Sequence, residues 1–190
     1  MILSCFSCRD TAILLIASLG LLGCAGSTRL SEIPLQTTYA ASRHGLLHYK
    51  VPVGWFDATS DSQTVASEIW LVKNDYAATI SVNEIIIDTD TRRAISGEGL
   101  IRLTNLLLSL SGANGPPTML NSPETFLLYE KTLCSYTMLK PNSNDTVRVV
   151  ILPVGERVFE VVALNSGKER RVSSRAVFSA QQSFLKGLRQ

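Results

Sequence analysis

Histidine side chains are the first place to look for catalytic or metal chemistry, because imidazole transfers protons and binds metal ions near neutral pH. The chain of 190 residues has two, His44 and His48. A spacing of four would place both rings on one face of a helix, where they could share a metal ion. Gly45 lies between them and an extended pattern begins at Leu46, which argues against a helix. We therefore expect no metal site at these histidines.

Carboxylates gather in one short stretch, where Glu84, Asp88 and Asp90 could offer oxygen ligands near the end of a strand. Their spacing differs from the Asp-x-Asp-x-Asp-Gly pattern of a calcium loop, so a solvated acidic turn is the expected structure. The sequence also lacks the Gly-x-Ser-x-Gly and His-Glu-x-x-His motifs and a glycine-rich phosphate loop before a helix. We expect no catalytic residue, no cofactor and no enzyme activity.

Thiol chemistry is limited by where the four cysteines lie. Cys5 and Cys8 stand at the start of the chain, and Cys134 lies in an alternating, strand-like pattern. No histidine is near Cys134 in sequence, so we interpret it as a small buried apolar residue rather than a reactive thiol. Cys24 is different, because it directly ends an apolar segment.

That apolar segment, Thr11 to Cys24, determines where the rest of the chain is delivered. It is too short to span a bilayer as a helix and has the length of the apolar region of a signal peptide. Its end, Leu21-Leu22-Gly23-Cys24, resembles the lipobox of bacterial lipoprotein precursors. The resemblance implies cleavage before Cys24 and acylation of its sulfur and of the new amino terminus. An ordinary secretory signal or an uncleaved anchor is the alternative.

A lipid anchor would hold a soluble domain on a membrane without a transmembrane helix. We expect residues 1–23 to form a signal peptide, residues 24–42 a flexible tether, and residues 43–190 a single domain. The lipoprotein resemblance implies the cell envelope. In Gram-negative lipoproteins of the kind that this segment resembles, an aspartate after the cysteine commonly marks inner-membrane retention. For a Gram-negative source, the resemblance and Ala25 therefore imply the outer membrane, facing the periplasm. The expected partners are the membrane and an envelope protein, and a net charge of +2 does not indicate nucleic-acid binding.

Hydrophobic periodicity predicts a mostly antiparallel sheet and two helices. Alternating and β-branched segments predict strands at residues 46–51, 65–73, 77–87, 126–139, 146–152 and 157–164. Apolar residues at helical spacing predict a helix over residues 93–111 and a second one from about Ser174, with Ser173 or Ser174 as its N-cap. The continuous apolar run at residues 85–87 indicates that both faces of the sheet are covered. We expect Leu107 and Phe184 to be buried on opposite faces.

Three short motifs fit this order of elements: Tyr49-x-x-Pro52-x-Gly54-Trp55 after the first strand, Val158-Phe159-Glu160-Val161 in a hairpin, and Ser183-Phe184 in the last helix. With them, the region from Leu46 to Leu188 resembles the PsbP-like superfamily, which includes DcrB-like bacterial lipoproteins. The resemblance implies an α+β fold with a helix packed on each face of the sheet. It also implies a non-enzymatic binding or assembly module, and it carries no functional motif over to this chain.

Candidate contact residues come from three places. Trp55 is either an anchor of the core or a binding platform. The long stretch from Gly112 to Pro123 is either a plain connector or the rim of a binding surface. The basic turn from Lys168 to Arg171 is either solvated or a patch that contacts anionic groups. The candidates in these two segments are Gly112, Asn114, Pro116, Pro117, Lys168, Arg170 and Arg171.

The function favoured by the sequence is a lipid-anchored envelope lipoprotein that binds a protein or assists assembly. Such a module presents an exposed apolar or charged patch. The alternative is a lipoprotein that binds a small molecule or a lipid in a concave apolar cavity between sheet and helix. A hydrolase of unrecognised type is the third possibility.

The lipoprotein interpretation predicts the behaviour of Cys24→Ala. Without the thiol there is no site for the acyl chains, whose burial at about 0.8 kcal/mol per methylene would hold the domain on the membrane. We expect this variant to be lost from the membrane fraction after alkaline washing. Immunoblotting of fractionated cells measures the change, and a processed variant that stays membrane-bound would contradict the lipoprotein interpretation.

Overall fold

The computed structural model describes residues 30–61, 67–111, 117–140, 143–166 and 172–190, without the side chains of residues 94–98 and 111. The predicted signal peptide and the first six residues of the predicted tether, Cys24 among them, lie outside these residues. In chain order the elements are β1 (Ala40–Ala41), β2 (His48–Tyr49), β3 (Trp55–Asp57), β4 (Ile69–Lys73), β5 (Ala78–Ile85), α2 (Thr89–Ser111), β6 (Thr118–Leu128), β7 (Lys131–Leu139), β8 (Thr146–Val154), β9 (Arg157–Asn165) and α3 (Ser174–Lys186).

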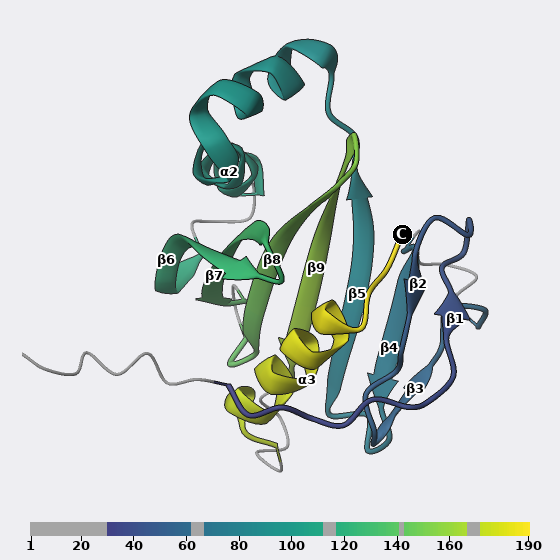
Figure 1. Cartoon of the computed structure of the whole chain (residues 1–190). Helices are drawn as coiled ribbons and strands as arrows, with labels where there is room; N and C mark the ends of the chain where they lie inside the picture. Colours follow the sequence, from purple (N-terminus) through teal and green to yellow (C-terminus); the bar gives the residue numbers. More distant parts are fainter. Residues whose placement is uncertain (1–29, 62–66, 112–116, 141–142, 167–171) are drawn as a thin grey trace, which may run out of the picture.

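A seven-stranded sheet in the order β3-β4-β5-β9-β8-β7-β6 forms the centre of the described structure. Every neighbouring pair in it is antiparallel. The hairpin of β8 and β9 lies in the middle of the strand order, and β3 and β6 are the edges. The predicted α+β class, a mostly antiparallel sheet with a helix on each face, is confirmed (Figure 1).

Helix α3 lies across one face of the sheet (Figure 1). Ser173 is its N-cap, because its side-chain oxygen accepts a hydrogen bond from the Ala176 amide at 3.2 Å. Helical spacing predicts a buried stripe of Ala176, Ala180, Phe184 and Leu188. The last three are buried against the sheet, whereas Ala176 is exposed. Phe184 is fully buried and meets Tyr49 edge to face, with the ring centroids 5.8 Å apart.

Helix α2 packs on the opposite face, against a second apolar cluster that contains Val149 and Ile151 of β8. It begins four residues earlier than predicted, and Gly99 interrupts it with φ 78° and ψ 174°. Leu103 is 2% exposed, whereas Leu107 is half-buried. The prediction of opposite faces is therefore confirmed, but Leu103 rather than Leu107 is the main anchor.

The predicted strand over residues 126–139 is wrong, because Tyr129 and Glu130 turn the chain between β6 and β7. Their φ values of 47° and 65° are both in the left-handed region, as a two-residue hairpin turn requires. No Asn-Gly or Asp-Gly pair marks this turn in the sequence. The predicted long loop is also wrong beyond residue 117, because Thr118 starts β6. Pro123 is tolerated in this strand because an edge strand need not donate every amide to a neighbour.

Residues 30–42 pack against the domain, which corrects the expectation of a flexible tether over that stretch. The backbone N–H of Ile33 donates to the Ser183 hydroxyl at 2.8 Å, and the backbone N–H of Gln36 donates to the Val51 carbonyl at 2.8 Å. Leu35 and Pro52 form an isolated antiparallel bridge. The polar composition of this segment does not show such backbone pairing, since any residue with an amide and a carbonyl can make it.

The burial difference along α2 predicts a matched pair of outcomes. Leu103→Ala should lower the free energy of unfolding by about 2–5 kcal/mol, because it leaves a cavity in the second cluster. Leu110, on the same helix, is 70% exposed. Leu110→Ala should therefore change the free energy of unfolding by less than about 0.5 kcal/mol. Urea titration of both variants measures the difference. Equal midpoints would mean that α2 does not cover the sheet as described.

Candidate binding groove

The candidate residues from the sequence are not brought together by the structure. Trp55 is 4% exposed and belongs to the core cluster beneath α3, in agreement with its interpretation as an anchor. Pro117 is half-buried immediately before β6. The remaining candidates lie outside the described residues: Cys24, Gly112, Asn114, Pro116, Lys168, Arg170 and Arg171. Their proposed roles stay predictions.

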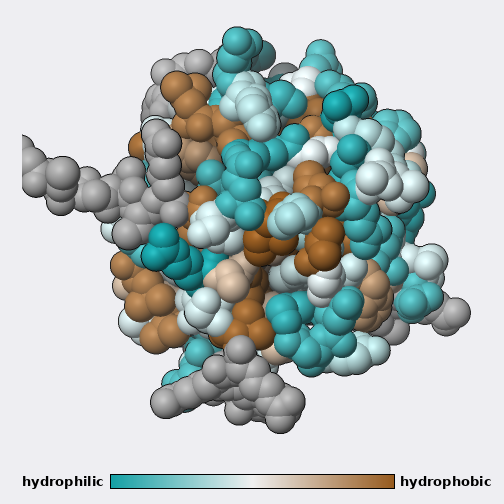
Figure 2. Space-filling view, turned by 60° about the horizontal axis from the view of Figure 1, so that its bottom comes forward, coloured by the Kyte–Doolittle hydropathy of each residue, from teal (hydrophilic) through white to brown (hydrophobic). Residues whose placement is uncertain are grey.

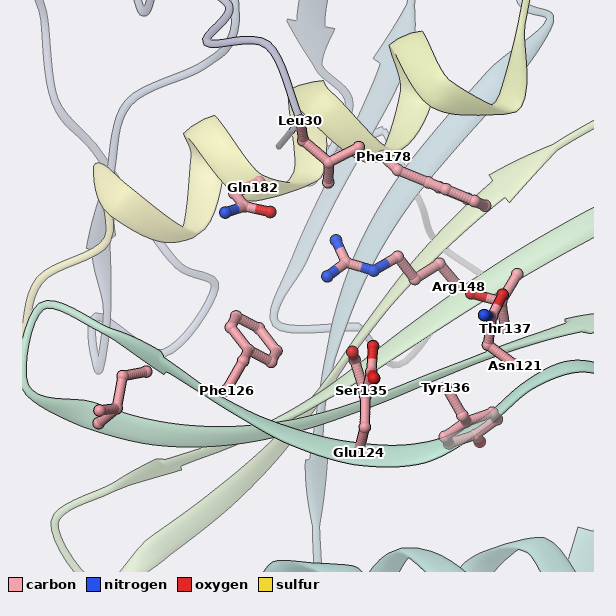
Figure 3. Close-up of a pocket in the computed structure, with 11 residues that line it drawn as sticks. Leu30, Asn121, Glu124, Phe126, Ser135, Tyr136, Thr137, Arg148, Phe178 and Gln182 are labelled. Atoms are coloured by element: carbon pink, nitrogen blue, oxygen red, sulfur yellow. The ribbon is translucent and has the colours of Figure 1, made fainter. Parts of the chain in front are cut away.

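An open groove of about 430 Å³ lies between α3 and the strands β6, β7 and β8 (Figure 3). Its rim is open to solvent, because Asn121, Glu124 and Leu127 on the edge strand are exposed. The groove is lined by Leu30, Asn121, Glu124, Phe126, Leu127, Ser135, Tyr136, Thr137, Arg148, Phe178 and Gln182. Both polar and apolar side chains therefore face the same space.

Arg148 of β8 is the cationic residue of this groove. On β8, Val147, Val149 and Ile151 belong to the cluster under α2, so the alternation of the strand turns Arg148 towards α3. Arg148 pairs in register with Thr137 of β7, which in turn pairs with Asn121 of β6. These three polar residues thus form a row across the strands at one end of the groove.

Gln181 of α3 holds Arg148 in place. An Nη atom of Arg148 donates to Gln181 Oε1 at 3.2 Å, and Gln181 Nε2 donates to the Arg148 carbonyl at 3.2 Å and the Val161 carbonyl at 2.8 Å. Gln181 is fully buried, so these bonds fix its side chain. Burial lowers the pKa of Arg148 to about 10, which still leaves the guanidinium charged at neutral pH.

Glu124 of β6 is the counter-charge of the groove. Its carboxylate favours the charged form of Arg148 through space and partly offsets the effect of burial on the arginine pKa. The described structure has no ion pair between these two side chains. Arg148 is half-buried and lines the groove, so part of its guanidinium stays accessible. Ser135, which pairs with Glu124 in register, adds a hydroxyl on the same side (Figure 3).

Aromatic side chains form the walls of the groove. The guanidinium carbon of Arg148 lies 5.7 Å from the centroid of the Phe126 ring, at a distance where a cation and an aromatic face attract each other. Phe178 of α3 and Leu30 of the N-terminal segment line the same space. Figure 3 shows the guanidinium end of Arg148 pointing into the space between Gln182 and Phe126. The cation thus lies between the side-chain amide of Gln181 on α3 and the Phe126 ring on β6.

A second groove of about 420 Å³ lies next along the same N-terminal segment, lined by Glu32, Ile33, Pro34, Leu35, Tyr129, Ser183 and Lys186. Lys186 forms an ion pair with Glu32 and lies 5.9 Å from the Tyr129 ring centroid. Its charge is therefore already paired. Figure 2 shows separate hydrophobic patches divided by hydrophilic residues on the side of the molecule that it views, rather than one continuous apolar face.

The described residues contain neither a cluster of metal-ligating side chains nor a helix that could span a membrane. No group of three or more His, Cys, Asp and Glu side chains there is arranged to hold a metal ion. His44 instead contacts the buried carboxylate of Glu68. No helix within the described ranges has the length and apolar character needed to cross a bilayer.

Comparison with known proteins gives fold similarity alone. No protein-family model matches the chain, and no curated protein matches it. The solution structure of cyanobacterial PsbP (CyanoP) from Synechocystis sp. PCC 6803 is similar with a TM-score of 0.50 and 13% identity, over 89% of this chain and 98% of that chain. The Ran-binding protein Mog1p of Saccharomyces cerevisiae is similar with a TM-score of 0.53 and 11% identity, over 83% and 96%. The fold is PsbP-like.

Arg148 was not identified as a site residue from the sequence. The sequence shows a charged residue inside an alternating strand, and such a residue usually faces solvent. The signal was present, because a sheet covered on both faces leaves little solvent for a side chain in a central strand. Glu124 and Gln182 had no sequence signal, since their role depends on where β6 and α3 lie relative to β8.

Glu160 of β9 is the corresponding charged residue on the α2 face of the PsbP-like sheet. It pairs in register with Asn83 of β5 and Ile151 of β8. Burial raises the pKa of Glu160, because the charged carboxylate loses its water. Burial also raises the pKa of Tyr136, and the charge of Glu160 adds to that effect. Glu160 lies outside the groove and is interpreted as a destabilising charge.

This interpretation predicts a pH-dependent effect of Glu160→Gln. A raised pKa in the folded state means that folding favours the protonated carboxyl, so stability falls as pH rises from the ordinary glutamate pKa through the raised one. The variant should therefore be more stable than the original protein at about pH 7, and the difference should vanish below about pH 4. Urea unfolding at both pH values measures it. A difference that is constant with pH would show that the charge of Glu160 is not responsible.

Proposed function

We propose that this PsbP-like domain is a non-enzymatic, lipid-anchored module of the cell envelope that binds a protein partner. The observation that carries the proposal is the open groove beside edge strand β6, with the partly buried cation of Arg148 inside it. Burial of a charged group is unfavourable unless another group compensates for it. A groove that keeps such a charge accessible is suited to a charged partner group.

The edge strand supports a protein partner. Strand β6 spans 11 residues at the end of the strand order, and its outer edge has no neighbouring strand in the described structure. Two apolar side chains on it are strongly exposed, Leu120 at 50% and Leu127 at 73%. Exposed apolar residues next to an unpaired edge are features of surfaces that pair with another chain.

The docked N-terminal segment supports a position close to the membrane. Leu30 lines the groove, and Cys24, the proposed acylation site, precedes it by six residues. Six extended residues span at most about 22 Å. With a lipid on Cys24, the groove would lie within that distance of the acyl chains. The partner would then be a protein at or near the same envelope membrane, with the outer membrane as the proposed location.

Site-specific photocrosslinking tests the proposed function. A photoreactive phenylalanine analogue at position 127 stands on β6 at the groove, whereas one at position 76 stands in the β4–β5 turn, near the other edge of the sheet. Tyr76 is 75% exposed and is therefore a matched control for Leu127. In intact cells we expect a discrete protein adduct from position 127 and none of the same mass from position 76.

Two results would contradict the proposed function. Identical adducts from both positions would show non-specific encounter. Absence of any adduct from position 127, in cells where the protein is at its normal membrane location, would show that β6 does not face a protein.

Small-molecule binding is the second candidate, favoured by one observation. The groove volume of about 430 Å³ lies within the usual range of ligand pockets. Its exposed rim argues for a protein, because a small ligand is normally enclosed over most of its surface. Native mass spectrometry of the protein purified from its own cells would detect a retained small molecule, and a stoichiometric one would favour this second function.

A further inference from the structure

We propose that the groove recognises a single carboxylate, the acidic side chain of a protein partner, through the guanidinium of Arg148. The proposal rests on the proposed function and names the chemical group that the partner presents. A guanidinium carries five N–H donors in a planar fork that matches the two oxygens of a carboxylate. In the described structure, Gln181 accepts one of these bonds at 3.2 Å.

The geometry of Arg148 is set before any partner arrives. Gln181 forms hydrogen bonds with both the side chain and the carbonyl of Arg148. The centroid of the Phe126 ring lies 5.7 Å from the guanidinium carbon. A cation held in this way loses little conformational entropy when it binds, which favours affinity. Burial has already removed part of its water, so a new charged hydrogen bond there is stronger than on an open surface.

The partner group is inferred to be a carboxylate rather than a polyanion because of Glu124. Among the described residues that line the groove, Glu124 is the acidic side chain and Arg148 the basic one. A phosphate or a cluster of acids would bring two or more negative charges against Glu124, and the like-charge repulsion would oppose binding. A single carboxylate meets the smallest repulsion while still satisfying the guanidinium.

The walls indicate what surrounds that carboxylate. Phe126, Phe178 and Leu30 offer apolar surface on either side of the cation. Apolar residues next to the acidic one would bury area against these walls, which is the dominant favourable contribution in most protein contacts. The hydroxyls of Ser135 and Thr137 can bond to main-chain groups of the incoming segment. The inferred ligand is therefore an acidic side chain flanked by apolar or aromatic residues.

A pair of capped peptides tests this inference, acetyl-Ser-Phe-Glu-Phe-Ser-amide and the same peptide with Gln in place of Glu. Each is titrated into the full-length, nitrogen-15-labelled protein in a non-ionic detergent, and the arginine Nε–H signals are followed by NMR. We expect the Glu peptide to shift the Arg148 signal in a saturable way and to bind at least about tenfold more tightly than the Gln peptide. Equal binding of the two peptides would overturn carboxylate recognition.

Three substitutions sharpen the test. Arg148→Gln should weaken binding of the Glu peptide by about tenfold or more, because the charged hydrogen bonds are lost. Glu124→Gln should tighten binding of the Glu peptide, because the repelling charge is removed. Glu124 is exposed, so this variant should stay folded and still tests the proposal if Arg148→Gln unfolds. Arg157→Gln is the control, because Arg157 pairs with Glu84 outside the groove. Unchanged binding in Glu124→Gln would overturn the role assigned to that charge.

The outcomes separate this inference from the proposed function. If position 127 crosslinks to a protein but the Glu and Gln peptides bind with equal affinity, the domain binds a protein without recognising a carboxylate at Arg148. If sodium acetate displaces the Glu peptide at concentrations similar to those of the peptide itself, the groove is a small-carboxylate site and the protein segment is the wrong occupant. If inorganic phosphate binds more tightly than the Glu peptide, the exclusion of polyanions is wrong.

Discussion

The packing of α3 on the sheet is the interaction on which the rest of this structure depends. Val177, Ala180 and Phe184 are fully buried, and together they cover the centre of one face of the antiparallel sheet. The contact does more than exclude water from apolar side chains. It also places the side-chain amide of Gln181 over Arg148 near the start of β8, where the backbone and side chain of this arginine need partners.

The groove is a consequence of how far α3 extends across the sheet. The helix covers the centre, so the side chains of β9 and of much of β8 are enclosed. Towards β7 and β6 the cover ends, and Arg148 lies at this border between enclosed and open surface. A charge at such a border keeps part of its solvation while its environment already has a low dielectric constant, which makes it sensitive to an incoming counter-charge.

The N-terminal segment connects this surface to the proposed membrane anchor. Residues 30–42 follow the domain instead of standing away from it, and Leu30 becomes part of the groove wall. A short connection to a lipidated cysteine would limit the orientations of the domain at the membrane. The groove would then be presented to proteins close to the membrane surface rather than to the bulk of the compartment, which raises the effective concentration of such partners.

The sequence by itself determined the class of the fold, because periodicities of two and 3.6 residues show which segments bury one face. It placed the β8–β9 hairpin and the opposite faces of the two helices correctly, and it limited the N-cap of α3 to Ser173 or Ser174, of which the structure has Ser173. It did not place the Tyr129-Glu130 turn, which has no glycine signal, or the docked N-terminal segment, which is held by backbone groups that every residue carries. Only the tertiary structure decided the groove, because Arg148, Glu124 and Gln182 come together through strand order and helix position, and neither is encoded in the spacing along the chain.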